Sequence, residues 1–124
     1  MELSAEQTAA LVSMVMDHAR RGETAELLEF LDHGMPVDVQ DPEGNTALML
    51  AAYRGNVETV RALIERGADV DLRNARDQSP VAGALFKGED EIVRLLRDAG
   101  ADLDAGTPSA RATAEMFGRT ELLD

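Results

Sequence analysis

The sequence contains no cysteine and no tryptophan, and it has only one tyrosine and three phenylalanines among its 124 residues. Without cysteine there is neither a disulfide framework nor a thiolate nucleophile, and the composition suits a reducing compartment. Because aromatic side chains are scarce, the core must be built from Leu, Val, Ile, Met and Ala. A core of that composition suits closely packed helices.

Long apolar runs are also missing. No segment reaches the roughly 18 consecutive apolar residues that a membrane-spanning helix needs. Residues 1–6 are acidic, whereas a signal peptide begins with basic residues followed by an apolar run. We therefore expect a cytoplasmic protein that does not associate with membranes.

Basic residues are few compared with acidic ones. The chain has 12 Lys and Arg against 24 Asp and Glu, which gives a formal net charge of −12. This charge repels nucleic-acid phosphates and anionic membranes, so we expect no nucleic-acid partner. It would attract a basic protein, although an acidic surface that only keeps the protein soluble explains the charge equally well.

The chain repeats itself with a period of 33 residues. Residues 41–71 recur as residues 74–104, so that Gly55 corresponds to Gly88. The repeated segment closes on Gly-Ala-Asp-Val-Asp (67–71) and then on Gly-Ala-Asp-Leu-Asp (100–104). A fixed period of this length indicates a repeat architecture in which each unit buries its apolar face against its neighbours.

Each unit contains the signals of two short helices joined by a turn at glycine. Ser4 with Gln7 forms a capping box at the start of the first helix, and Ser79-Pro80 resembles an N-cap followed by the first helical residue. Apolar residues have helical spacing in the segments 4–22, 24–33, 46–53, 57–66, 109–117 and 119–124. Residues 79–99 contain two further segments, which correspond to 46–53 and 57–66 one repeat later.

No group of residues has the spacing of a catalytic or metal site. His18 and His33 belong to different helices, and no His-Glu-x-x-His pair occurs. The serines at the helix starts read as caps and not as nucleophiles. The pairs Asp69/Asp71 and Asp102/Asp104 could recruit a cation only weakly. We therefore expect no enzymatic activity, no metal and no cofactor.

The repeated residues resemble the ankyrin repeat. The resemblance rests on Thr-Ala-Leu (46–48) and Ser-Pro-Val (79–81), on the inter-helix glycines, and on the closing Gly-Ala-Asp segments. It implies an all-α solenoid of about four helix-turn-helix units with β-hairpin-like loops at right angles to the helices. It also implies a small stand-alone protein-binding module, which we expect to be bacterial.

The resemblance divides a single domain, residues 1–124, into four units. These are an N-terminal capping repeat (4–39), two full repeats (40–72 and 73–105) and a partial C-terminal cap (106–124).

Several residues depart from the ankyrin pattern. Met49 and Ala82 occupy the place of the family's histidine, so its hydrogen bond between neighbouring loops is missing. Gly83 falls within a helix, at a cost of about 1 kcal/mol relative to alanine. The asparagine that often closes each repeat, and that is hydroxylated in some ankyrin proteins, is replaced by aspartate at Asp38, Asp71 and Asp104.

The resemblance places a binding surface on the concave face, where the inner helices end. Two residues before each inter-helix glycine should lie side by side as a basic and aromatic stripe. They are Arg20, Arg21, Tyr53, Arg54, Phe86, Lys87, Met116 and Phe117. The loop tips would supply the rim, through Pro42, Glu43, Asn45, Ala75, Arg76 and Gln78.

Arg and aromatic residues dominate binding hot spots, which favours a functional stripe. Basic residues are also preferred at helix C-termini, and an aromatic residue there can simply pack on the next repeat. Both explanations remain open at the sequence level.

The sequence therefore predicts a monomeric interaction module that binds another protein as an adaptor or inhibitor. One alternative is a structural protein that associates with itself, because Leu122 and Leu123 would leave the last face of a short stack exposed. An enzyme or a metal-binding protein is a more remote alternative.

Overall fold

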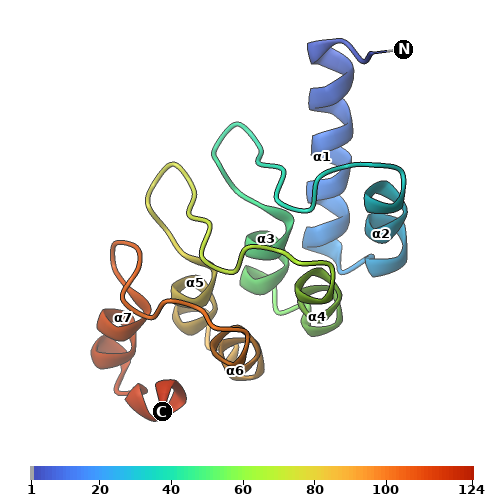
Figure 1. The fold of residues 1–124 in the computed structure, drawn as a ribbon. Helices are drawn as coiled ribbons and strands as arrows, with labels where there is room; N and C mark the ends of the chain where they lie inside the picture. The colour runs from blue at the N-terminus through green and yellow to red at the C-terminus, as the bar shows by residue number, and fades with distance from the viewer. Residues whose placement is uncertain (1) are drawn as a thin grey trace.

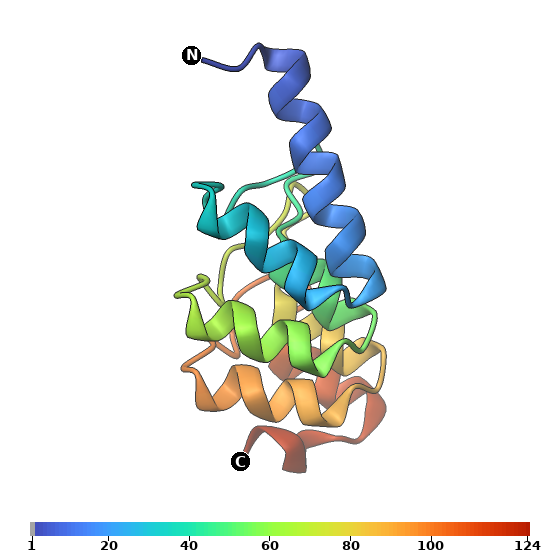
Figure 2. The same cartoon turned by 90° about the vertical axis from the view of Figure 1, so that its right-hand side faces the viewer.

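The computed structural model describes residues 2–124 and shows a stack of helix pairs (Figures 1 and 2). Met1, the first residue of the predicted domain, lies outside the described residues. In chain order the helices are α1 (Ala5–Arg21), α2 (Thr24–Asp32), α3 (Ala47–Tyr53), α4 (Val57–Glu65), α5 (Pro80–Phe86), α6 (Asp90–Asp98), α7 (Ala110–Phe117) and the 3₁₀-helix η1 (Thr120–Leu123).

The helices form two layers. The inner layer is α1, α3, α5 and α7, each in contact with the next, and the outer layer is α2, α4, α6 and η1 (Figure 1). The loops between the helix pairs leave the stack on the inner side. They turn back like hairpins, although residues 2–124 contain no β-strand. The all-α repeat architecture that the sequence predicted is confirmed.

Local capping signals fix where the inner helices begin. The side chain of Ser4 accepts a hydrogen bond from the amide of Gln7, and the Gln7 side chain accepts one from the amide of Ser4 at 2.8 Å, which completes the predicted capping box. Each later inner helix has a hydroxyl N-cap that accepts from the amide three residues on. These caps are Thr46, Ser79 and Ser109.

The outer helices end one residue earlier than predicted. α2 ends at Asp32 and α4 at Glu65, because His33 and Arg66 take up non-helical C-cap conformations. The imidazole Nδ1 of His33 lies 2.8 Å from the carbonyl oxygen of Glu29, so this side chain is hydrogen-bonded to a carbonyl group in the last turn of α2.

The end of the chain differs from the prediction. The closing segment is one short turn of 3₁₀-helix, η1, instead of the beginning of an α-helix. Leu122 is only 2% exposed and belongs to the main core, while Leu123 packs against that core. The expectation that Leu122 would be left exposed is wrong, because η1 folds back onto α6 and α7.

The core contains no buried aromatic side chain among residues 2–124, as the composition predicted. Small residues occupy the contacts between inner helices, and they let neighbouring backbones approach closely. Longer aliphatic side chains fill the space between the two layers. The fully buried ones include Leu27, Val60, Leu63, Ile92 and Leu96.

Asn56 joins the second helix pair to the first. Its side-chain Nδ2 donates to the carbonyl oxygens of Ala19 at 2.8 Å and Arg20 at 3.0 Å, at the end of α1, where carbonyls lack their usual helical partners. The equivalent residue of the next repeat is Glu89. A carboxylate has no proton to donate, and the Glu89 side chain forms no hydrogen bond within residues 2–124.

A ladder of aspartates connects the closing loops of successive repeats, and we call it the aspartate ladder. Asp38 Oδ1 accepts from the amide of Asp69 at 2.9 Å, and Asp71 Oδ1 accepts from the amide of Asp102 at 2.7 Å. Within each loop, Asp69 and Asp102 accept from the amides of Asp71 and Asp104. The aspartate pairs noted in the sequence therefore act as acceptors that hold the backbone.

Two kinds of feature are missing from the described residues. Nowhere in residues 2–124 do three or more His, Asp or Glu side chains gather closely enough to hold a metal ion. None of the helices in this range combines the length and apolar character that crossing a membrane would require.

Candidate functional site

An apolar groove with a volume of about 370 Å³ lies over the inner helices α3, α5 and α7. Four of the predicted partner residues line it, namely Tyr53, Gln78, Phe86 and Met116. The remaining lining residues were not predicted to bind a partner. They are Met49, Ser79, Pro80, Ala82, Gly83, Pro108 and Thr113.

Large apolar side chains around this groove face the solvent. Tyr53 is 42% exposed, Phe86 61%, Met116 68% and Phe117 50%. Each ends an inner helix, where the stack no longer covers it. Contiguous exposed apolar surface of this kind marks interaction sites in soluble proteins.

In its central and C-terminal part the predicted stripe is a set of neighbouring side chains. The rings of Phe86 and Phe117 meet edge to face, with centroids 5.9 Å apart. The ammonium group of Lys87 lies 5.0 Å from the centroid of the Tyr53 ring, in the geometry of a cation–π contact. Each contact joins one repeat to the next, so these exposed residues form one surface.

The N-terminal part of the stripe lies apart from the groove. Arg20 is bonded to Asp17 of its own helix at 3.0 Å. It lines a separate hollow between α1 and the first loop, which also includes Gln40 and Pro42. The structure therefore does not bring Arg20 together with the aromatic residues.

Gly83 creates space at the floor of the groove. A Cβ atom added to Gly83 would lie 3.6 Å from Cδ1 of Tyr53 and would meet nothing nearer. The corresponding residue one repeat earlier is Leu50, whose side chain packs against the core. The absence of a side chain at position 83 therefore leaves space beside the Tyr53 ring.

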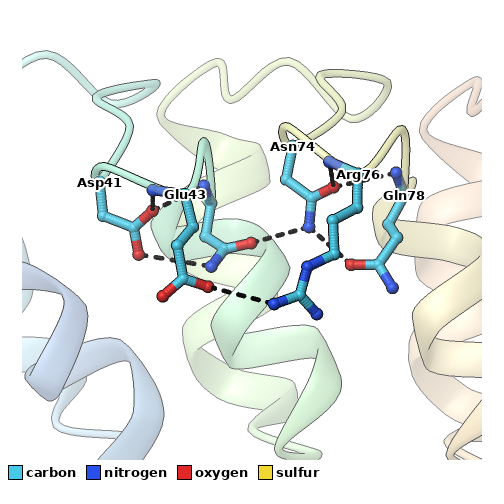
Figure 3. A network of polar contacts seen from close by, with 6 residues as sticks. Asp41, Glu43, Asn74, Arg76 and Gln78 are labelled. Atoms are coloured by element: carbon cyan, nitrogen blue, oxygen red, sulfur yellow. Dashed lines mark hydrogen bonds and ion pairs between the residues drawn. The ribbon is translucent and has the colours of Figure 1, made fainter.

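The predicted rim residues sit in two loops with the same internal geometry (Figure 3). In the first loop, Asp41 Oδ1 accepts from the amides of Glu43 and Asn45, both at 2.9 Å. In the second, Asn74 Oδ1 accepts from the amides of Arg76 and Gln78, both at 3.0 Å. Each loop thus presents its tip in a fixed conformation.

The two loops are also bonded to one another. Asn74 Nδ2 donates to Asn45 Oδ1 at 2.9 Å, and the amide of Ala75 donates to the carbonyl of Glu43 at 2.9 Å. Arg76 and Glu43 form an exposed ion pair at 3.9 Å (Figure 3). The side chain of Asn45 is therefore engaged in holding the loops, whereas Pro42, Ala75 and Arg76 remain exposed at the tips.

A family model described as ankyrin repeats (three copies) matches residues 15–107. The chain belongs to the ankyrin repeat family. No curated protein matches the sequence. Ankyrin repeats are generally protein–protein interaction modules, and the family is typically non-enzymatic.

Three departures from the ankyrin pattern meet in the groove. Met49 and Ala82 occupy the position of the family's histidine, and both line the groove together with Gly83. These departures were visible in the sequence. That they meet could be seen only once α3 and α5 were placed side by side.

Two lining residues from the last unit, Pro108 and Thr113, were missed for a different reason. Pro108 and Thr113 lie in the shortened unit, where the period of 33 residues no longer holds. No alignment of this unit to the others singles them out, because neither residue type is typical of a binding site.

Proposed function

We propose that this ankyrin repeat protein is an interaction module that binds one partner protein over the groove and the adjoining loop tips, as an adaptor or an inhibitor. The observation that carries the proposal is the cluster of exposed Tyr53, Phe86, Met116 and Phe117 around an apolar groove. The other exposed large apolar side chain of the inner helices is Met14 of α1, and it lies outside the groove. These four are therefore the ones that stand together and are available to a partner.

The energetics support this surface as a binding site. Fully burying one large apolar side chain contributes about 1.5–3 kcal/mol. Interface hot spots are enriched in aromatic residues and arginine that sit in well-packed central pockets. Here the aromatic residues surround the groove and the loops form a preordered polar rim, which reduces the entropy lost on binding.

The test is a double variant, Tyr53→Ala with Arg54→Glu, compared with the wild type in a pull-down from the source cell. We expect loss of the partner that the wild type recovers. The matched control is Met14→Ala with Arg61→Glu, which also removes one exposed apolar side chain and reverses one charge, both outside the groove. Equal recovery by the folded groove variant and the wild type would refute the proposal.

We further propose that the protein is a cytoplasmic monomer that binds neither nucleic acid nor membranes. The net charge of −12 supports this, because it repels polyanions and other copies of the chain. The burial of Leu122, one of the two leucines that suggested self-association, also supports a monomer. Sedimentation velocity over a range of concentrations should show one monomeric species, and a dimer at micromolar concentration would contradict it.

A further inference from the structure

Three basic residues at the ends of the inner helices have no acidic partner, and we call them the basic column. They are Arg21, Arg54 and Lys87. All three are exposed, and within residues 2–124 none lies within 4.0 Å of a carboxylate oxygen. This is notable in a chain with twice as many acids as bases.

A preference for cations at helix C-termini does not account for the basic column. The outer helices α4 and α6 also end near basic residues, Arg66 and Arg97. Arg66 pairs with Asp32 at 2.7 Å, and Arg97 pairs with Asp98 at 3.0 Å. Arg66 and Arg97 are therefore neutralised within the chain, and so is Arg20 of α1 by Asp17. The three residues of the basic column have no such partner within residues 2–124 and are left for another molecule.

Two residues of the basic column, Arg54 and Lys87, end helices that line the groove, whereas Arg21 ends α1, which does not. Lys87 lies over the ring of Tyr53, and Tyr53 lines the groove. Arg54 follows Tyr53 directly at the end of α3. Neighbouring helices pack with their axes about 8–10 Å apart, so the backbone positions that carry the basic column recur at about that interval.

We propose that the partner contributes an extended acidic segment, with carboxylates at every third position facing the basic column and a large apolar side chain in the groove. This inference rests on the proposed function and adds the chemistry of the partner. In a polyproline II conformation, residues three apart lie on the same face and are about 9 Å apart. That interval matches the spacing of the basic column.

The surrounding charge limits the length of this segment. At physiological ionic strength the Debye length is about 8 Å, so a bound carboxylate responds mainly to the nearest cations. A long polyanion would extend over the acidic remainder of the surface and be repelled. A short segment that combines acidic and apolar residues satisfies both the basic column and the groove.

The experiment begins with a random peptide library displayed on phage and selected on the immobilised full chain. We expect the selected peptides to carry Asp or Glu three residues apart beside Phe, Leu or Met. A second selection on the variant Tyr53→Ala with Phe86→Ala should not enrich these peptides. Selected peptides that are neutral or basic would overturn the inference.

One selected peptide is then synthesised, and its affinity is measured by fluorescence anisotropy. Arg54→Glu with Lys87→Glu should weaken binding by about tenfold or more, because like charges would face one another. The control, Arg61→Glu with Arg94→Glu, changes the net charge equally at two exposed outer-layer residues that are also unpaired within residues 2–124. It should bind within about twofold of the wild type.

A second variant guards against loss of folding. Arg54→Gln with Lys87→Met keeps a polar side chain at position 54 and an aliphatic stem beside Tyr53 while it removes both charges, and it should also weaken binding. If both variants are folded and bind as the wild type does, the acidic segment is wrong, although the groove can still be the site. If peptides bind the Tyr53→Ala with Phe86→Ala variant as well as the wild type, the proposed function fails too.

Discussion

At the scale of single residues, Gly44 and Gly67 share a backbone conformation but not their surroundings. Their φ angles are +82° and +85°. A Cβ atom on Gly44 would lie 2.7 Å from the backbone nitrogen of Ala75, whereas one on Gly67 would meet nothing within 4 Å. Only at Gly44 does the next loop approach too closely for any side chain.

Substituting each glycine by alanine separates these two effects. Gly67→Ala should cost about 1–2 kcal/mol of unfolding free energy, from the left-handed conformation alone. Gly44→Ala should cost clearly more, because the loop at Ala75 must also move. Urea unfolding followed by circular dichroism measures both values. Equal costs would show that the approach of the second loop is not a constraint.

The sequence predicted both glycines equally well as turn residues, since each stands in a segment without helical periodicity. The sequence does not show which of the two glycines tolerates a side chain less well, because the close approach depends on where the neighbouring loop lies. Asp77 makes the same point. It takes the place of Gly44 one repeat later and has a φ angle of +60°, which its residue type alone does not predict.

At the scale of elements, the joint between α1 and α3 depends on Asn56. Asn56→Ala removes two hydrogen bonds to carbonyls at the end of α1, and the Ala19 carbonyl then keeps only a long bond of 3.4 Å from the amide of Gly22. We expect a loss of about 1–3 kcal/mol in the free energy of unfolding. The matched change one repeat later, Glu89→Ala, should stay within about 0.5 kcal/mol of the wild type.

Thermal and urea unfolding of both variants checks this difference. Equal effects of Asn56→Ala and Glu89→Ala would mean that the two bonds to α1 contribute nothing measurable.

The elements themselves were largely predictable, because a cap acts within three residues of the helix it starts. Ser4, Thr46, Ser79 and Ser109 all begin helices where expected. The 3₁₀-helix at the end of the chain was not predictable, because η1 is held by tertiary contacts with α6 and α7. Arg97 also donates to the carbonyl of Leu122 at 3.0 Å, a contact across 25 residues.

The candidate site was predicted in part for a similar reason. The period placed Tyr53 and Phe86 at equivalent positions, so their proximity followed from the repeat. The groove also needs Gly83 and residues of the shortened last unit, and these obey no period. Its shape emerges only from the packing of three repeats.

At the scale of the whole molecule, each helix pair buries its apolar surface mainly against its neighbours, so unfolding should be cooperative. Leu63 is fully buried in α4, in the middle of the stack. Leu63→Ala should cost about 2–5 kcal/mol and should unfold most of the array in one transition. Hydrogen exchange would check this, and protection that persists in α6 and α7 while α4 opens would contradict it.

The aspartate ladder brings several carboxylates to one edge of a protein with a net charge of −12. Asp71→Asn keeps an oxygen acceptor for the amide of Asp102 and removes one charge, so stability at low salt should be unchanged or higher. Asp71→Ala loses the hydrogen bond and should cost about 0.5–1.5 kcal/mol.

Melting curves at low and at physiological salt check these outcomes. The wild type should gain more from added salt than Asp71→Asn does, because salt screens the repulsion that the substitution relieves. A lower melting temperature for Asp71→Asn than for Asp71→Ala would contradict the role assigned to the acceptor oxygen.

Gly83, the glycine within helix α5, lowers the stability of the helix but keeps the groove wide. A methyl group on Gly83 would reach ordinary van der Waals contact with Tyr53, and alanine in a helix gains about 1 kcal/mol over glycine. Gly83→Ala should therefore raise the melting temperature, which calorimetry measures, while it narrows the groove. If the groove is the binding site proposed above, laboratory evolution that rewards survival at high temperature alone would select variants that no longer capture the partner.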